Sequence, residues 1–339
     1  MRRVREALQA GLWRRARSLS GQVDFFGDQA AHGKVVAAPL DDDVRLLASK
    51  IPSGLRFGTS TWSFSGWQGL VYGGGYEETK LSRDGLAAYA RHPLLRSVGV
   101  DRSYYRPLDD KTLQRMADAV GDDFRFLMKA HASLMLPKSA RRPEYLLGVP
   151  DVFLDAAYAS RNVIEPALRL LGDKLGVILF QFSPLGDRVL RYRDKLLERL
   201  EAFLSALPKE VRYAVEWRDA AMLGLDLADL LARHKVSYGF AAHPRMPNVD
   251  EQSSFDTGEG PMVIRWLLRR DRAYDEARAT YAPFDRLVEP DSESRHRILS
   301  LLRGAEGQGR EALVIVNNKA EGSSPLSVLQ LAREWSAVG

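Results

Sequence analysis

Short apolar segments alternate with longer amphipathic segments from about residue 55 to the end of the chain. Runs rich in β-branched and aromatic residues predict strands, and apolar residues spaced three and four apart predict helices. The predicted strands span residues 55–60, 97–101, 124–129, 176–182, 212–217, 236–241, 262–267 and 312–317. The predicted helices between them span 79–91, 110–120, 152–171, 190–207, 225–234, 292–302 and 325–337, and the sixth strand is followed instead by a Pro-rich and Ser-rich loop.

Several of these strands are apolar at every position, as in residues 177–180 and 313–316. This pattern is typical of a strand in a parallel sheet that is buried on both faces. Helices cover both faces of an open sheet, whereas in a barrel the sheet closes on itself and helices cover its outer face. An open, doubly wound sheet is the alternative, but no G-x-G-x-x-G motif follows the first strand. Eight alternating units therefore predict an α/β fold, a TIM (β/α)8 barrel with an N-terminal extension. We place the extension or linker at residues 1–53, where residues 21–52 are loop-like, and the barrel at 54–339.

The net charge of +5 is confined to the start of the chain. Residues 21–339 contain 43 basic and 43 acidic residues, so the predicted barrel is neutral. A basic arm would attract DNA nonspecifically through its phosphates. The charge of the first 20 residues comes from one glutamate and six arginines, namely Arg2, Arg3, Arg5, Arg14, Arg15 and Arg17.

Apolar segments of targeting or membrane-spanning length are missing from the sequence. The longest apolar runs are far shorter than the roughly 18 residues of a membrane span, so no membrane partner is predicted. The basic arm is interrupted by polar residues and does not resemble a secretory signal, so we expect a cytoplasmic protein. An organellar transit peptide is the alternative, because it would share the Arg-rich, acid-poor composition.

A short peptide within the arm is a candidate docking segment. Residues 22–26, Gln-Val-Asp-Phe-Phe, resemble the Q-L-[S/D]-L-F peptide by which bacterial replication and repair proteins bind the sliding clamp. Gln22 would bind a polar pocket, and Phe25 and Phe26 would fill an apolar one. The alternative is that both phenylalanines pack onto the barrel and hold the arm in place.

The carboxyl ends of the predicted strands carry the candidate site residues, because barrel active sites form there. Arginine and lysine at these ends suit a phosphate or carboxylate ligand, and a buried glutamate can serve as general acid or base. The alternatives are a structural ion pair between Glu216 and Arg218 and simple packing by the aromatic residues. The proposed catalytic residues are Glu216 and Lys129, and the proposed ligand-binding residues are Arg218, Arg265, Asp101, Tyr105, Gln181, Asn317, Asn318 and Trp62.

A metal or cofactor site is not indicated. The chain has no cysteine and only six histidines, which show neither H-x-H nor H-E-x-x-H spacing. Ser60 lacks the G-x-S-x-G context of a serine hydrolase. We therefore predict neither a metal nor an organic cofactor.

Six motifs together resemble the domain of unknown function 72 family, also called YecE-like, whose members form TIM-type barrels. The order and spacing of these motifs agree with the family over residues 55–335. They are FGTSTW at 57–62 for the family's G-T-S-G-W, SYYR at 103–106 for T-F-Y-R, FLMKA at 126–130 for F-x-x-K-A, LGVILFQ at 175–181 for L-G-x-x-L-F-Q, AVEWR at 214–218 for A-V-E-F-R, and VNN at 316–318 for F-N-N.

The resemblance implies a barrel fold. At some positions where the family has a polar residue, this chain has the same residue. Gly99 and Asp101 stand where the family has glutamate and asparagine, and Met135 and Leu136 replace its T-H pair. The chain is therefore identified as a divergent member of the family. The matched polar residues are Lys129, Glu216, Arg218, Arg265, Asn317 and Asn318.

Three functional hypotheses follow. The first is an enzyme, of hydrolase or phosphodiesterase type, that binds an anionic small molecule or a phosphodiester at the barrel mouth. The second is a non-catalytic accessory protein of DNA repair or replication that docks on the sliding clamp through residues 22–26. The third is a non-catalytic binding barrel.

Overall fold

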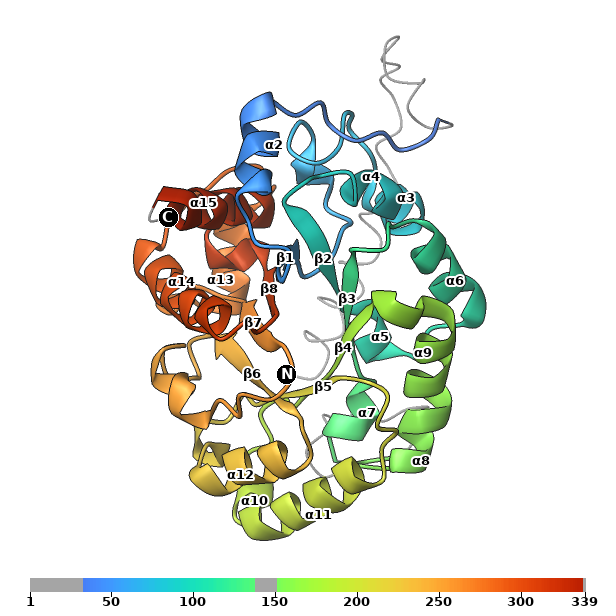
Figure 1. Ribbon diagram of the computed structural model, residues 1–339, viewed down its shortest axis with the longest axis vertical. Helices are drawn as coiled ribbons and strands as arrows, with labels where there is room; N and C mark the ends of the chain where they lie inside the picture. The colour runs from blue at the N-terminus through green and yellow to red at the C-terminus, as the bar shows by residue number, and fades with distance from the viewer. Residues whose placement is uncertain (1–32, 138–150, 338–339) are drawn as a thin grey trace, which may run out of the picture. The chain divides into compact units, whose positions relative to one another are not determined.

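Eight parallel strands close into a barrel in which each strand pairs with its neighbours in chain order (Figure 1). The computed structural model describes residues 33–137 and 151–337. The predicted TIM (β/α)8 fold is confirmed, and every strand begins and ends within two residues of its predicted bounds. The strands are β1 (Leu55–Thr59), β2 (Leu95–Val100), β3 (Arg125–Lys129), β4 (Leu175–Gln181), β5 (Tyr213–Glu216), β6 (Ser237–Ala242), β7 (Met262–Trp266) and β8 (Ala312–Val316).

Side chains alternate between the barrel interior and the surrounding helices, because successive residues of a strand point to opposite faces. One face forms an apolar cluster that includes Leu127, Leu179, Ala214 and Ile315. The intervening residues, such as Phe126, belong to the larger core that also contains helix residues. The last residues of β3, β4 and β5 continue the interior face, so their polar side chains lie above the apolar cluster at the mouth of the barrel.

Helices surround the strands (Figure 1). The longer ones bury apolar side chains against the barrel. In α11, for example, Leu196, Leu200 and Phe203 are buried. In α6, the Asp109 side chain caps the first turn by accepting a hydrogen bond from the Thr112 amide. The helices that follow the strands include α6 (Asp110–Asp118), α9 (Glu165–Leu171), α11 (Arg193–Ser205), α12 (Leu225–Arg233), α14 (Ser292–Gly307) and α15 (Ser324–Ala337).

Short elements fill the connections between strands and helices. The long connection after β6 contains the 3₁₀ helix η7 (Glu251–Phe255) in place of an α-helix, as the Pro-rich and Ser-rich sequence implies. The other short elements are α5 (Arg102–Tyr105), α7 (Ala132–Met135), η1 (Ser65–Trp67), η5 (Gly172–Lys174), η6 (Ala220–Met222) and η8 (Asn318–Ala320).

Three predicted helices are divided in the structure. The helix predicted at 79–91 consists of α3 (Glu78–Asp84) and α4 (Leu86–Tyr89), which meet at Gly85. The helix predicted at 152–171 begins with α8 (Ala156–Ala159) and passes through the π-helical turn η4 (Ser160–Ile164) into α9. The helix predicted at 190–207 is preceded by α10 (Asp187–Leu190). Hydrophobic periodicity continues through each break, so the pattern alone does not reveal it.

Among the described residues, two helices of eight residues were not predicted, and both are largely exposed. In α13 (Tyr274–Tyr281) only Ala277 and Tyr281 are buried. In α2 (Asp42–Ser49) no residue is fully buried. The loop-like reading of residues 21–52 is therefore wrong for the part that α2 occupies.

The segment before β1 packs against the loop that follows this strand. Val35 and Ala38 are buried, and the Ala38 amide donates a hydrogen bond to the Val71 carbonyl at 2.9 Å. Val35–Gly339 forms one compact unit. The proposed docking residues Gln22, Phe25 and Phe26 lie outside the described residues.

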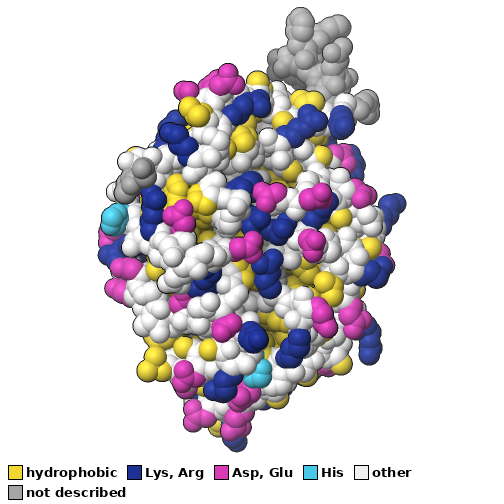
Figure 2. Space-filling model, in the orientation of Figure 1, with side chains coloured by type: hydrophobic (Ala, Val, Ile, Leu, Met, Phe, Trp, Pro, Cys, Tyr) yellow, Lys and Arg dark blue, Asp and Glu magenta, His cyan; other side chains and the backbone are white. Residues whose placement is uncertain are grey.

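Lysine and arginine side chains alternate with acidic side chains over the face shown in Figure 2. No helix in the described part of the chain is both long and apolar enough to span a lipid bilayer. This mixed surface agrees with the balanced composition of residues 21–339.

Candidate functional site

Charged side chains from several strands converge at the carboxyl end of the barrel. Gln181 and Glu216 are the last residues of β4 and β5 and stand opposite each other in the sheet register. Lys129 ends β3, and Arg265 lies one residue before the end of β7. All four share the interior face with the apolar cluster, so the strand alternation itself directs them into the mouth.

Glu216 is fully buried between two arginines. The Arg218 Nε atom donates a hydrogen bond to Glu216 Oε1 at 2.6 Å, and Arg265 Nη1 lies 3.2 Å from Oε2. Burial opposes the charged form, but the attraction of Arg218 and Arg265 outweighs it and lowers the pKa of Glu216. The carboxylate is therefore ionised at neutral pH.

Arg265 connects this carboxylate to the neighbouring strands. Its Nη1 atom also donates to Gln181 Oε1 at 3.3 Å, and its Nη2 atom lies 3.7 Å from Asp101 Oδ1. The Arg265 Nε atom and Asp101 Oδ1 are both buried, and neither has a hydrogen-bond partner among residues 33–137 and 151–337. The cluster therefore retains unused donor and acceptor capacity, which a bound ligand or water could satisfy.

Lys129 is a buried amine at the mouth. Its Nζ atom lies 3.5 Å from Asp101 Oδ1 and 4.2 Å from the centre of the Tyr104 ring. The Tyr104 hydroxyl is 2.9 Å from Ser183 Oγ. Burial lowers the pKa of Lys129 to about 8, with Asp101 opposing the shift and Arg265 adding to it. Lys129 thus exchanges its proton close to physiological pH.

Lys319 and His243 follow the ends of β8 and β6 in the sequence, and they add two ionisable groups near this cluster, although they are not among the ligand-binding residues proposed above. Lys319 is buried in η8, and burial lowers its pKa to about 8 while Asp101 opposes the shift. Burial and the positive charge of Arg218 lower the pKa of His243 to about 4, so this imidazole is neutral. Lys319 lies two residues after Asn317, just past the carboxyl end of β8, and this position in the sequence indicates that it can reach the mouth.

Other predicted ligand-binding residues lie apart from the Glu216 cluster. Trp62 is buried and donates from Nε1 to the Leu81 carbonyl. Asn318 accepts hydrogen bonds from Ser324 at the start of α15. Tyr105 is 78% exposed, whereas its neighbour Tyr104 contacts Lys129.

Asn317 stays at the edge of the mouth. Its side-chain oxygen accepts a hydrogen bond from the Lys319 amide at 3.0 Å. This contact caps η8, and it places the backbone of Lys319 next to the end of β8. Asn317 therefore helps to position the loop that carries the second buried lysine.

The mouth carries more positive than negative charge. Lys129, Arg218, Arg265 and Lys319 face two carboxylates, Glu216 and Asp101. Within residues 33–137 and 151–337, no three His, Asp or Glu side chains are grouped as metal ligands would be. The arrangement is suited chemically to holding an anion beside an amine that can transfer a proton.

Comparison with known proteins assigns most of the chain to one family model. The model is described as a protein of unknown function, DUF72, and it matches residues 56–338. No curated protein matches the sequence.

Two solved structures show the same fold. A DUF72 family protein from Thermotoga maritima MSB8 is 21% identical, with a TM-score of 0.57, and the match covers 83% of this chain and 98% of that chain. A DUF72 family protein from Enterococcus faecalis V583 is 17% identical, with a TM-score of 0.57, and the match covers 83% of this chain and 95% of that chain. At these identities the likeness establishes the fold alone.

Proposed function

Because the chain belongs to the DUF72 family, whose function is unknown, its own residues have to indicate its activity. We propose that the barrel mouth binds a small anionic substrate, a phosphate ester, and that Lys129 transfers a proton during its hydrolysis. The excess of positive charge around the fully buried Glu216 carries this proposal.

Arg218 is the side chain best placed to bind the anion. One edge of its guanidinium pairs with Glu216, which fixes its orientation. A guanidinium fork can present its remaining N–H groups to a phosphate oxygen. His243 lies close enough to Arg218 for its pKa to respond to that charge, and its Nδ1 atom accepts from the Arg245 amide at 3.1 Å. The proton of the neutral ring is therefore on Nε2, where it can donate to an anion.

Lys129 and Glu216 receive different roles in this proposal. Glu216 is clamped by two arginines with a lowered pKa, so we assign it the role of a fixed counter-ion that orients Arg218 and Arg265. Lys129, with a pKa of about 8, is matched to proton transfer near neutral pH. As the oxygen of the attacking water bonds to phosphorus and the ester P–O bond breaks, protonated Lys129 would donate its proton to the departing alkoxide, and the water would release its own proton to the solvent. Arg218 would stabilise the negative charge on the phosphoryl oxygens.

Inorganic phosphate is a direct probe of the anion site. Arg218→Gln is expected to weaken phosphate binding roughly 10- to 100-fold in isothermal titration at pH 7, which is the loss of a charged hydrogen bond of about 1.5–3 kcal/mol. Arg188 in α10 is exposed, so Arg188→Gln serves as the matched control and should bind as the wild type does.

Equal affinity in Arg218→Gln and Arg188→Gln would contradict an anion site at the mouth. Folding of the Arg218→Gln protein is checked by its thermal transition. Arg218→Lys provides a second variant, which retains the charge and should recover part of the affinity.

A further inference from the structure

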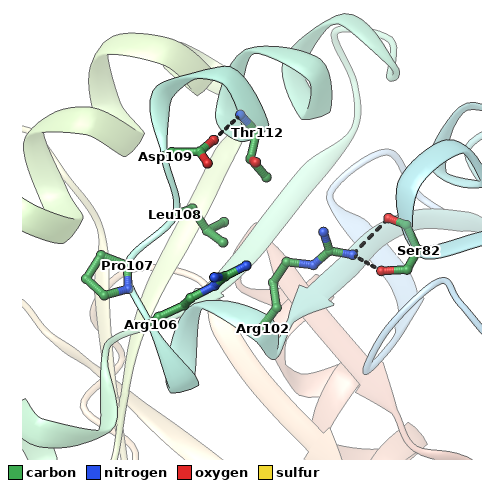
Figure 3. A pocket seen from close by; sticks show the side chains of 7 residues that line it. All are labelled: Ser82, Arg102, Arg106, Pro107, Leu108, Asp109 and Thr112. Atoms are coloured by element: carbon green, nitrogen blue, oxygen red, sulfur yellow. Dashed lines mark hydrogen bonds between the residues drawn. The ribbon is translucent and has the colours of Figure 1, made fainter. Parts of the chain in front are cut away.

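A second cluster of arginines surrounds a cavity outside the barrel mouth (Figure 3). The cavity has a volume of about 320 Å³ and lies between α3, α5 and the start of α6. This volume is within the range of about 300–1,000 Å³ that is typical of small-molecule sites. Arg102 and Arg106 extend into the cavity from the two ends of the segment that contains α5.

Arg102 is held rigidly at one wall. Its Nη2 atom donates to the Ser82 carbonyl at 2.9 Å and to Ser82 Oγ at 2.7 Å (Figure 3). Its guanidinium carbon lies 4.6 Å from the centre of the Trp62 ring. These contacts leave the Nη1 and Nε hydrogens without a partner in the described part of the chain. The donor geometry is therefore fixed before any ligand binds.

Positive charge exceeds negative charge on the cavity wall, where Arg102 and Arg106 accompany Asp109. Among the described residues, no carboxylate lies within ion-pair distance of Arg102, Arg106 or the nearby Arg115, whose hydrogen bond goes to Thr112 Oγ1 at 3.3 Å. Burial, followed by repulsion from Arg115 and Arg106, lowers the pKa of Arg102. Of the described residues on the cavity wall, only Asp109 is a carboxylate, and it caps α6 by accepting a hydrogen bond from the Thr112 amide at 2.7 Å.

We propose that this cavity is a second anion site, which binds the phosphate group of a small phosphomonoester or free phosphate through Arg102 and Arg106. Two guanidiniums and one carboxylate line the cavity, which leaves an excess of one positive charge to attract a phosphate anion. The hydroxyl of Thr112 accepts from Arg115 and still has its own hydrogen to donate to a phosphate oxygen. Pro107 and Leu108 provide an apolar wall for the organic part of an ester.

This site is distinct from the mouth, although the two are adjacent in sequence. Asp101 interacts with Lys129 and Arg265 in the mouth, whereas the next residue, Arg102, binds Ser82 of α3 on the outer side. The proposal therefore stands or falls independently of the function assigned to the mouth.

The test is isothermal titration of the full chain with inorganic phosphate and with phenyl phosphate at constant ionic strength. Wild-type protein should show two sites. Arg106→Gln should weaken binding at one of them at least tenfold and leave the other site, the one that Arg218→Gln weakens, unchanged. Because Arg106 is exposed, this variant is expected to fold normally, and the exposed Arg91→Gln is its matched control.

Each outcome decides the proposal. If the wild type binds phenyl phosphate more tightly than phosphate and Arg106→Gln loses this difference, the ligand is an ester. If Arg106→Gln reduces the affinity for both probes equally, the ligand is the free anion. Unchanged titrations in Arg106→Gln would overturn the second site while leaving the mouth proposal intact. Loss of binding to a short DNA duplex in Arg106→Gln, with unchanged binding of both phosphate probes, would also overturn it, since the arginines would then serve a nucleic acid.

Discussion

Glu216→Gln is expected to destabilise the barrel by about 3–5 kcal/mol, because removing one partner of a buried ion pair leaves an uncompensated charge in the interior. Glu216 is fully buried, and it is the shared acceptor of Arg218 and Arg265, which are themselves almost fully buried. The amide keeps the shape of the side chain but not its charge. Urea unfolding at pH 7 measures the change in the free energy of unfolding.

The difference in the free energy of unfolding between wild type and Glu216→Gln is expected to decrease at low pH. Arg218 and Arg265 lower the pKa of Glu216 in the folded protein against the opposing effect of burial, so its stabilising contribution is complete above the ordinary glutamate pKa of about 4.3. The difference between wild type and variant should shrink as the pH falls below that value toward the lowered pKa.

Glu201→Gln is the matched control for this substitution. Glu201 accepts a hydrogen bond from Arg233 at 2.9 Å on the protein surface, where solvent screens the interaction. A Glu216→Gln protein no less stable than the Glu201→Gln protein would contradict the role of Glu216 as the buried counter-ion.

Anion affinity at the mouth is expected to fall roughly 10- to 100-fold as Lys129 loses its proton, the effect of removing one charged hydrogen bond of about 1.5–3 kcal/mol. The pKa of Lys129 is about 8, so the decrease should occur between pH 7 and 9.5. By linkage, a bound anion raises this pKa, which moves the decrease to higher pH at saturating ligand. Sulfate is the suitable probe, because its own charge does not change over this range.

Two lysine variants show whether Lys129 or Lys319 causes this pH dependence of sulfate binding. Lys129→Met should bind sulfate weakly and without the pH-dependent step, whereas Lys319→Met should retain the step. The Arg106→Gln background restricts the titration to the mouth. A step that persists in Lys129→Met would show that another group, such as Lys319, controls binding.

The sequence predicted the barrel well because its strands are encoded locally. Each strand is a short apolar run, and its pairing in chain order follows from the βαβ connections. The missed helices α2 and α13 are largely exposed. The breaks within the 79–91 and 152–171 helices do not disturb the hydrophobic periodicity. Hydrophobic periodicity therefore located the buried strands and helices. It missed helices that are largely exposed, and it missed the breaks in helices that stay buried on both sides of the break.

The direction of a site residue's side chain could be predicted from the sequence only for residues within the strands, where side chains alternate between the two faces. Lys129, Gln181 and Glu216 end their strands, so their direction follows from the pattern of the strand. Residues beyond the strand ends take directions set by the local turn. Tyr104 rather than Tyr105 contacts Lys129, because both belong to the short helix α5, where neighbouring side chains diverge.

The most direct test of anion binding at the barrel mouth is a crystal structure of the full chain grown in inorganic phosphate. We predict a phosphate within hydrogen-bonding distance of the Arg218 guanidinium and Lys129 Nζ, above the ion pairs of Glu216. A mouth that contains only water at saturating phosphate, with Arg218 and Lys129 unchanged, would contradict the proposed function.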